Sequence, residues 1–171
     1  MKPVQTLSTP RFSLRPLRRE DAAALFPTLS DEGQCRYLLQ GAFESEEALW
    51  AWLADPTWDG RTWIAEDKAT GEVAARFVAV PTDLEGCQEE IGYITCKQRQ
   101  RDGVARECME VLIPHLLGEE GTTRLLAGVD PENTASVVLL QRLGFTHLRT
   151  DKGTCTTHIG VRDEGWYILS S

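Results

Sequence analysis

The feature that most constrains the fold is a basic loop that joins an apolar segment to an amphipathic one. Residues 89–96 (EEIGYITC) carry apolar side chains on both faces of an extended chain, which is typical of a central strand. From Val104 to about Leu117 the apolar residues recur at helical spacing, although Pro114 should bend or shorten a helix there. Because KQRQRDG lies between the two, the sequence predicts a strand, a glycine-containing basic loop and a helix in succession.

This succession predicts a binding site for a phosphate-bearing ligand. The first backbone N–H groups of a helix have no partner within it, and the helix dipole adds about half a positive charge at the same end. Gly103 lets a ligand approach the backbone without a side chain in the way. The loop is rich in basic residues although the formal net charge of the chain is −8; they are Lys97, Arg99, Arg101 and Arg106. The P-loop motif and the dinucleotide-binding glycine motif are both missing from the sequence.

The rest of the sequence predicts a mixed α/β chain. Alternating, branched or aromatic residues indicate further strands over 12–16, 61–67, 72–80, 123–129, 146–150 and 164–171. Apolar residues at helical spacing indicate further helices over 19–31, 45–55 and 134–143. Ser45 and Asn133 are expected to cap two of these helices, and Gly144 is expected to end the last one. Pro27 should kink or end the first of them.

Length and composition argue against several classes of protein. The 171 residues are expected to form a single domain, 1–171, with one sizeable core. A cytoplasmic protein without membrane contact is expected, because no run approaches the roughly 18 apolar residues of a span and the N-terminus lacks a signal-peptide core. The acidic balance argues against nucleic acid as a partner. The five scattered cysteines lack C-x-x-C spacing, which argues against disulfides and a metal site.

Residues 100–105 (QRDGVA) fit the pattern Q-x-x-G-x-A, which resembles the pyrophosphate loop of the GNAT superfamily of acyl-CoA-dependent N-acyltransferases. Three other segments match this superfamily in the right order. The opening 9–31, EEIGY at 89–93 and NTASVVLLQRLGF at 133–145 are similar to its RimJ/RimL-like branch of ribosomal-protein alanine N-acetyltransferases. The resemblance therefore covers nearly the whole chain, to about Arg149.

This resemblance implies both a fold and a reaction. The fold is a central twisted mixed sheet of about seven strands with about four flanking helices and a splayed fourth and fifth strand pair. In the reaction, a primary amine of a protein N-terminus or a small molecule attacks the thioester of acetyl-CoA through a tetrahedral intermediate, without a metal. The residues implied for acetyl-CoA are Ile94, Thr95, Cys96 and Asn133 beside the pantetheine arm and Gln100, Arg101, Asp102, Gly103, Val104 and Ala105 around the pyrophosphate.

The resemblance also implies candidates for catalysis and acceptor binding. Glu90 matches the family glutamate that can accept the amine proton; its neighbour Glu89 must face the other way on a strand, and either can be a solvated acid instead. Ser136 matches a serine that can protonate the CoA thiolate, although it can also serve only in capping its helix. Tyr37 and Trp52 lie where the family binds its acceptor, with core packing as the alternative for both.

Two residues depart from the family pattern. Arg101 stands where most relatives have a small residue, so its side chain should point out of the loop. Leu140 stands where many relatives have the tyrosine that protonates the leaving thiolate. A non-catalytic acyl-CoA binding module is therefore the alternative to an N-acetyltransferase. The protein is expected to be a monomer or a homodimer.

Overall fold

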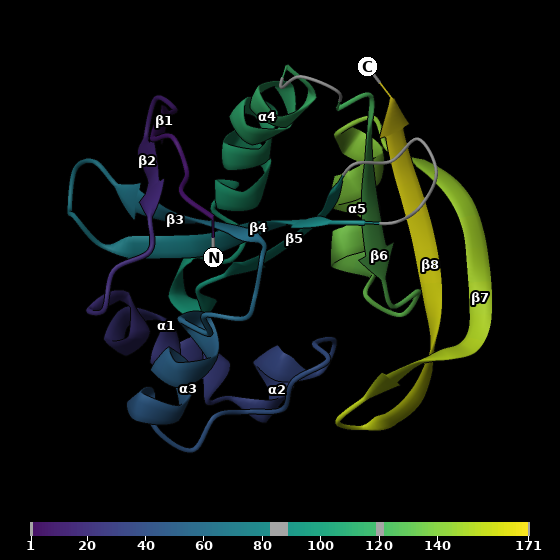
Figure 1. Ribbon diagram of the computed structural model, residues 1–171, viewed down its shortest axis with the longest axis horizontal. Helices are drawn as coiled ribbons and strands as arrows, with labels where there is room; N and C mark the ends of the chain where they lie inside the picture. Colours follow the sequence, from purple (N-terminus) through teal and green to yellow (C-terminus); the bar gives the residue numbers. More distant parts are fainter. Residues whose placement is uncertain (1, 83–88, 119–121, 171) are drawn as a thin grey trace.

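The computed structural model describes residues 2–82, 89–118 and 122–170 (Figure 1). It confirms a mixed α/β fold, with eight strands and five α-helices where about seven and four were expected. In chain order the elements are β1 (Leu7–Ser8), β2 (Phe12–Pro16), α1 (Asp21–Leu29), α2 (Glu32–Cys35), α3 (Glu46–Leu53), β3 (Arg61–Asp67), β4 (Val73–Pro81), β5 (Glu89–Thr95), a short 3-10 turn η1 (Lys97–Arg99), α4 (Val104–Leu117), β6 (Arg124–Val129), α5 (Thr134–Arg142), β7 (Thr146–Thr157) and β8 (Gly160–Ser170).

All eight strands form one sheet in the order β1-β2-β3-β4-β5-β6-β8-β7. Neighbouring strands are antiparallel except β5 and β6, which are parallel. These two strands pair only at Glu89 with Leu125 and at Glu90 with Leu126, and beyond these residues they separate. Figure 1 shows the two strands diverging in the middle of the molecule. The predicted splay is therefore confirmed, and it opens the sheet at its centre.

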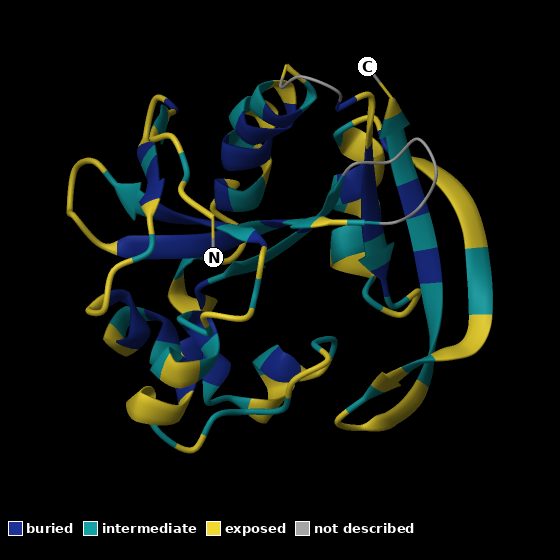
Figure 2. Ribbon diagram, in the orientation of Figure 1, coloured by how far each residue is buried: buried dark blue, intermediate teal, exposed yellow. Residues whose placement is uncertain are grey.

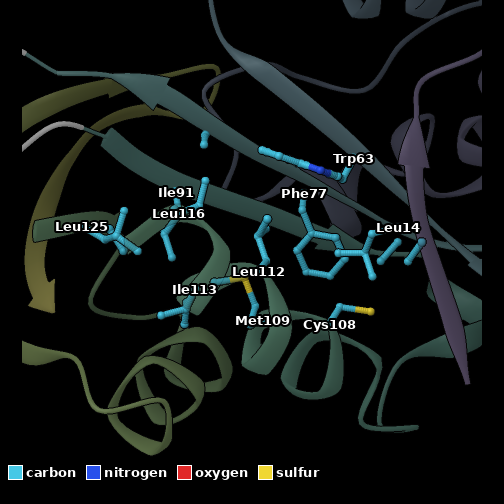
Figure 3. Packing of buried hydrophobic residues seen from close by; sticks show 14 of the residues in the cluster. Leu14, Trp63, Phe77, Ile91, Cys108, Met109, Leu112, Ile113, Leu116 and Leu125 are labelled. Carbon is cyan, nitrogen blue, oxygen red and sulfur yellow. The ribbon is translucent and has the colours of Figure 1, made fainter. Parts of the chain in front are cut away.

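Helices cover both faces of the sheet and divide the core in two. On one face, α4 packs Met109, Leu112 and Leu116 against the sheet around Phe77 and Leu14 (Figure 3). On the other face, α1 and α3 form a second cluster that includes Leu25, Leu49 and Ile64 (Figure 1). Figure 2 shows the central strands largely buried and the outer strand β7 largely exposed. The sheet is thus buried at its centre, where β5 and β6 separate.

The expected helix caps are present. Ser45 accepts a hydrogen bond from the backbone N–H of Ala48 at 3.1 Å at the start of α3. Asn133 accepts one from the backbone N–H of Ser136 at 3.3 Å at the start of α5. Gly144, just beyond α5, has φ +90°, a backbone conformation that favours glycine. These local signals fix where α3 and α5 begin and where α5 ends.

Both helices continue past their internal prolines, so neither proline ends its helix, and a kink or bend at these residues stays a prediction. α1 continues past Pro27 to Leu29, and α4 continues past Pro114 to Leu117. A proline inside a helix costs about 3 kcal/mol, because it removes one hydrogen bond and crowds the preceding turn. Burial of the side chains beyond each proline offsets this cost by about 1.5–3 kcal/mol for each large apolar residue. Leu29 is 1% exposed and Leu116 is 0% exposed, so tertiary packing holds both last turns.

Two short elements were not expected from the sequence, and one expected pair of strands is longer than expected. β1 and α2 are short, with two and four residues, and carry too few residues for a periodic pattern. The hairpin of β7 and β8 is much longer than the expected strands 146–150 and 164–171. Its pairing shifts register between Asp151 and Cys155, which interrupts the alternation of side chains there. His158 at its turn donates its backbone N–H to the carbonyl of Leu39 at 3.2 Å, so the hairpin reaches the segment after α2.

No helix in the described ranges is both long and apolar enough to cross a membrane.

Candidate active site

A cavity of about 910 Å³ lies where β5 and β6 separate. The sheet lines it with β5 and β6. The other lining segments are the loop before α4, the helix α5, and the segment around α2 across the opening. The lining residues come from 33–38, 91–95, 99–106, 127–130 and 133–142. The strand, loop and helix singled out in the sequence therefore meet at one cavity.

The loop 100–105 enters α4 through two residues with left-handed backbone. Gly103 is the N-cap of α4 with φ +74°, and Arg101 has φ +68°. Arg101 is the one residue other than glycine with positive φ in the described ranges, and this conformation costs an L-residue about 1–2 kcal/mol. Glycine at this position would avoid the cost. The Arg101 side chain is exposed, as expected.

Most basic residues of the loop are paired within the protein. Lys97 contacts Asp31 at 2.6 Å and Arg99 contacts Asp67 at 2.8 Å. Arg106 contacts Glu110 at 2.8 Å. Among the residues that the structure describes, Arg101 has no ion pair. The charge free to meet a phosphate is therefore smaller than the sequence suggested, and Arg101 contributes most of it.

Arg11, which sequence reasoning missed, holds the loop against α4. Its guanidinium contacts Glu107 at 2.6 Å and donates a hydrogen bond to the carbonyl of Asp102 at 2.9 Å. On the other side of the loop, Gln100 donates from its amide to the side-chain oxygen of Gln34 at 2.6 Å. The turn between β1 and β2 and the helix α2 thus fix the loop from two directions. No local signal in the sequence marks either contact, because more than sixty positions separate the partners.

Side chains and backbone groups of β5 face the cavity in alternation. Ile94 and Thr95 line the cavity, whereas Cys96 is 1% exposed and donates its backbone N–H to Ala74 of β4 at 2.9 Å. Burial raises the pKa of the Cys96 thiol to about 11. Because backbone direction alternates along a ladder, Thr95 turns its N–H and C=O toward the side where β6 has separated. The structure therefore brings Ile94 and Thr95 to the site and assigns Cys96 to the sheet.

α5 presents Asn133 and Ser136 to the same cavity. Both residues line it, and the Asn133 side chain is also the cap of α5. Ser136 is half-buried, with its hydroxyl near the phenol of Tyr93 on β5. Leu140, one turn further along α5, is 1% exposed and offers no acidic proton. Serine, asparagine and tyrosine therefore supply the polar groups on the two sides of the opening.

The two neighbouring glutamates of β5 have different surroundings. Glu89 forms an ion pair with Arg61 at 2.5 Å. Glu90 points toward Gly128 of β6, where a Cβ would lie 3.2 Å from its carboxylate oxygen. Glu164 of β8 reaches the same place, 3.0 Å from that Cβ position, so the two carboxylate oxygens are at most about 6 Å apart. Neither glutamate is among the residues that line the cavity. Glu90 lies behind the lining residue Gly128, beside a second acid, whereas Glu89 is held by Arg61.

Burial and like charge raise the pKa of Glu90. Loss of solvation is the larger cause, repulsion from Glu164 adds to it, and a hydrogen bond from the backbone of Gly128 opposes both. The pKa of Glu164 is also raised, by burial and then by Asp151. Sequence reasoning missed Glu164, which lies beyond the region of resemblance. Only the pairing of β6 with β8, Gly128 opposite Trp166, brings it to the site.

The two acceptor candidates have different positions. Tyr37 lines the cavity and donates its hydroxyl to the carbonyl of Glu132 at 3.3 Å, which links α2 to the start of α5. Trp52 is outside the lining; its ring packs against Phe43, with 5.3 Å between ring centroids, and under the guanidinium of Arg76 at 4.8 Å. Core packing was the alternative for both residues. Trp52 packs in this way, whereas Tyr37 lines the cavity.

No group of three or more His, Cys, Asp or Glu residues within the described ranges could hold a metal ion.

Comparison with known proteins identifies the family. The acetyltransferase (GNAT) domain matches residues 11–146. An uncharacterised N-acetyltransferase, p20 of Bacillus licheniformis, is 29% identical over 147 residues that make up 83% of each chain. A GNAT-family acetyltransferase from Bacillus anthracis has a TM-score of 0.86 at 19% identity, over 97% of this chain and 98% of its own. RimL, a ribosomal α-N-protein acetyltransferase solved with coenzyme A, has a TM-score of 0.80 at 16% identity, over 97% of this chain and 98% of its own. The chain therefore belongs to the GNAT acetyltransferase family, whose members use acetyl-CoA, and it is an acetyltransferase.

Proposed function

We propose that this acetyltransferase transfers the acetyl group of acetyl-CoA directly to a primary amine, and that the cavity between β5 and β6 is its active site. The observation that carries the proposal is that the two strands pair at only two positions and then separate beside the loop 100–105. A long, flexible thioester ligand needs such an opening, with an anion site at one end and hydrogen-bonding backbone along it. The fold supplies both.

The residues present fit acetyl-CoA. Backbone N–H groups at the start of α4, with Arg101 beside them, suit a pyrophosphate, and Gly103 keeps the approach open. A Cβ at Gly103 would meet only the end of Arg11, at 3.6 Å, so its absence leaves room toward the ligand. Thr95 offers its backbone to the pantetheine arm, with Ile94 beside it and the Asn133 side chain opposite. Acetyl-CoA supplies an activated acyl group whose thiol, with a pKa near ~8.5, leaves readily.

Glu90 is proposed as the base that receives the amine proton, through a water molecule. An amine arrives protonated near neutral pH and must lose a proton before it attacks. The raised pKa of Glu90 brings this carboxyl closer to the working pH of such a base. Glu164 lies beside it and contributes negative charge that attracts a cationic acceptor. Glu89, which is held by Arg61, is not needed for this role.

Ser136 is proposed as the group that protonates the departing thiolate. It faces the cavity from the first turn of α5, and Leu140 excludes the alternative tyrosine of many relatives. The proposed acceptor is a protein N-terminus or a small-molecule amine, and Tyr37, which lines the cavity, is proposed to contact it. A protein α-amine is supported by the likeness to RimL, and the acidic surroundings of Glu90 suit either cation.

The test is thiol release from acetyl-CoA in the presence of a panel of amines that includes peptide N-termini, polyamines, amino acids and aminoglycosides. The expected result is release that depends on one class of amine, with the acetylated amine identified by mass spectrometry. Acetyl-CoA binding without turnover on any amine would instead favour the non-catalytic acyl-CoA module. Neither binding nor turnover would contradict both functions.

A further inference from the structure

Tyr93 of β5 has a buried hydroxyl without a partner. Its phenolic oxygen is shielded from solvent and forms no hydrogen bond of normal geometry to any described residue. Leaving a buried hydroxyl unpaired costs about 1–3 kcal/mol, so native proteins rarely keep one without a reason. The ring itself packs well, 6.4 Å from the ring of Phe77 between centroids, so the hydroxyl is not required to fill the core. The cost therefore points to a role for this hydroxyl beyond packing.

The Ser136 hydroxyl is a polar group close to the Tyr93 hydroxyl. Burial raises the pKa of Tyr93, and the Ser136 hydroxyl lowers it in part. This effect requires the two oxygens to be close, although the pair does not meet the geometry of a full hydrogen bond. Hydrogen bonds of catalytic groups are often long or poorly aligned without substrate and tighten in the reacting complex. Tyr93 and Ser136 thus face each other across the opening between β5 and α5, and both line the cavity.

We propose that Tyr93 is a positioning residue that donates a hydrogen bond to the Ser136 hydroxyl and directs the Ser136 proton toward the departing CoA thiolate. This inference rests on the proposed function, and it adds the residue on which the acid depends. A serine hydroxyl rotates freely and is both donor and acceptor. When its oxygen accepts from Tyr93, its own hydrogen is left for the sulfur, and a chain of two hydroxyls polarises each bond in it.

The proton movements balance. When the tetrahedral intermediate collapses, the C–S bond breaks and its electron pair stays on sulfur. The Ser136 proton moves to sulfur, and the Ser136 oxygen, which accepts the hydrogen bond from Tyr93 throughout, regains a proton from water in the cavity. The raised pKa keeps Tyr93 protonated at neutral pH, so the donor is ready in each turnover. Two hydroxyls from β5 and α5 thereby replace the single tyrosine whose place Leu140 occupies.

The first test is Tyr93→Phe, which removes one oxygen and keeps the ring against Phe77. The substrate is an amine that the parent protein acetylates. We expect kcat to fall about 10- to 100-fold, which is at or below the lower end of the effect of a proton-transfer group. KM for acetyl-CoA should not change. Tyr167→Phe makes the same deletion in a buried tyrosine outside the cavity lining and is expected to keep the parent kcat. Equal kcat in Tyr93→Phe and the parent would overturn the inference.

The second test asks whether Tyr93 acts through Ser136. In a Ser136→Ala background, Tyr93→Phe is expected to lower kcat no further, because the hydroxyl that it orients is gone. If the double variant instead lowers kcat by the product of the two single effects, Tyr93 and Ser136 act independently, and the inference is overturned. If the parent itself turns over no amine, the proposed function fails, and this inference fails with it.

A third readout does not depend on turnover. Binding of CoA is compared with binding of desulfo-CoA, which lacks the sulfur, by calorimetry at about pH 9, where much of the thiol with a pKa near ~8.5 is ionised. Tyr93→Phe is expected to weaken CoA binding several-fold and to leave desulfo-CoA binding unchanged. An equal loss for both ligands, or for neither, would contradict a hydroxyl pair aimed at the thiolate. Urea unfolding should show Tyr93→Phe at least as stable as the parent, since an unpaired buried hydroxyl is removed.

Discussion

Glu90 on β5 and Glu164 on β8 turn their carboxylates toward the same glycine, Gly128, on the strand between them. A Cβ at Gly128 would lie 3.2 Å from one carboxylate oxygen and 3.0 Å from the other. The sheet order β5-β6-β8 creates this approach, since the two acids are 74 positions apart in the sequence but only one strand apart in the sheet. Two partly buried acids of like charge raise the cost of ionising Glu90.

The pKa shift of Glu90 predicts that Glu90→Gln stabilises the fold at neutral pH. The pKa of Glu90 is raised in the folded state above its usual 4.5, so folding favours the protonated form. Its stabilising contribution is therefore present below about pH 4.5 and is lost as the pH rises through the folded pKa. A neutral glutamine avoids this loss. Urea unfolding should show a larger free energy of unfolding for the variant at about pH 7 and a smaller difference at about pH 4.5. A difference that does not change with pH would contradict the shift.

The same substitution tests the proposed base. Glu90→Gln is expected to lower kcat about 10²- to 10⁴-fold near neutral pH. The kcat of the variant should recover as rising pH deprotonates the amine without help. KM for acetyl-CoA should change little, because the carboxylate acts on the amine in the transition state. The measurement is the pH dependence of kcat for the parent and the variant. Glu89→Gln is the comparison within the same strand, and it should leave the shape of the profile unchanged. Overlapping profiles for Glu90→Gln and the parent would remove Glu90 from the mechanism.

Gly128→Ala is expected to disturb the acid pair more than the fold. The new methyl group would lie within about 3 Å of both carboxylates, so at least one must move, and both are ends of flexible side chains. We expect kcat to fall at least about tenfold, as loss of one positioned proton-transfer group allows. The free energy of unfolding should change by less than about 1 kcal/mol, as is usual for a substitution that core packing can absorb. The measurements are steady-state kinetics and urea unfolding of the same preparation. Loss of stability with unchanged kcat would show that the pair serves only the fold.

Gly103→Val tests the loop as the phosphate site. The backbone of Gly103, at φ +74°, disfavours a branched side chain, and the space beside it is needed by the ligand. Gly71→Val is a matched control, because Gly71 has φ +75° and has no atom within 4 Å of its Cβ position. Both variants should lose similar stability, about 1–2 kcal/mol. Calorimetry should show acetyl-CoA binding weakened at least about tenfold, a change of about 1.4 kcal/mol, in Gly103→Val alone. Equal affinity in the two variants would place the phosphates elsewhere.

Much of the fold follows from patterns that are local in the sequence. The strand 89–95, the loop 100–105 and the helix from Val104 could be predicted because periodicity, glycine and capping act over a few residues. Whether the two internal prolines end their helices could not be decided from local preference, since burial of residues such as Leu116 depends on the whole core and outweighs that preference. The lower half of the β7–β8 hairpin was missed because a register shift breaks its alternation.

The site was predictable only where one segment carries it. The resemblance located Asn133, Ser136 and the loop 100–105, and all of these residues except Asp102 line the cavity, whereas Glu90 lies outside the lining. Residues that reach the site through long-range pairing left no signal, and Glu164 and Arg11 are the examples. Tyr93 lay inside a segment that was quoted for its resemblance, yet its role depends on facing Ser136 across an opening that only the structure reveals. Trp52 was expected at the acceptor site because of its place in the sequence, but it packs under Arg76 and does not line the cavity.

Acetyl-CoA is proposed to bind in the opening between β5 and β6. The most direct measurement is the melting temperature of the protein at increasing concentrations of acetyl-CoA. A ligand that binds only the folded state stabilises it by RT ln(1 + [L]/Kd), which is about 4.1 kcal/mol at a thousandfold excess over Kd. With binding in the micromolar range, the melting temperature should rise steadily up to millimolar acetyl-CoA in the parent and much less in Gly103→Val. No rise in the parent at millimolar acetyl-CoA would contradict the account.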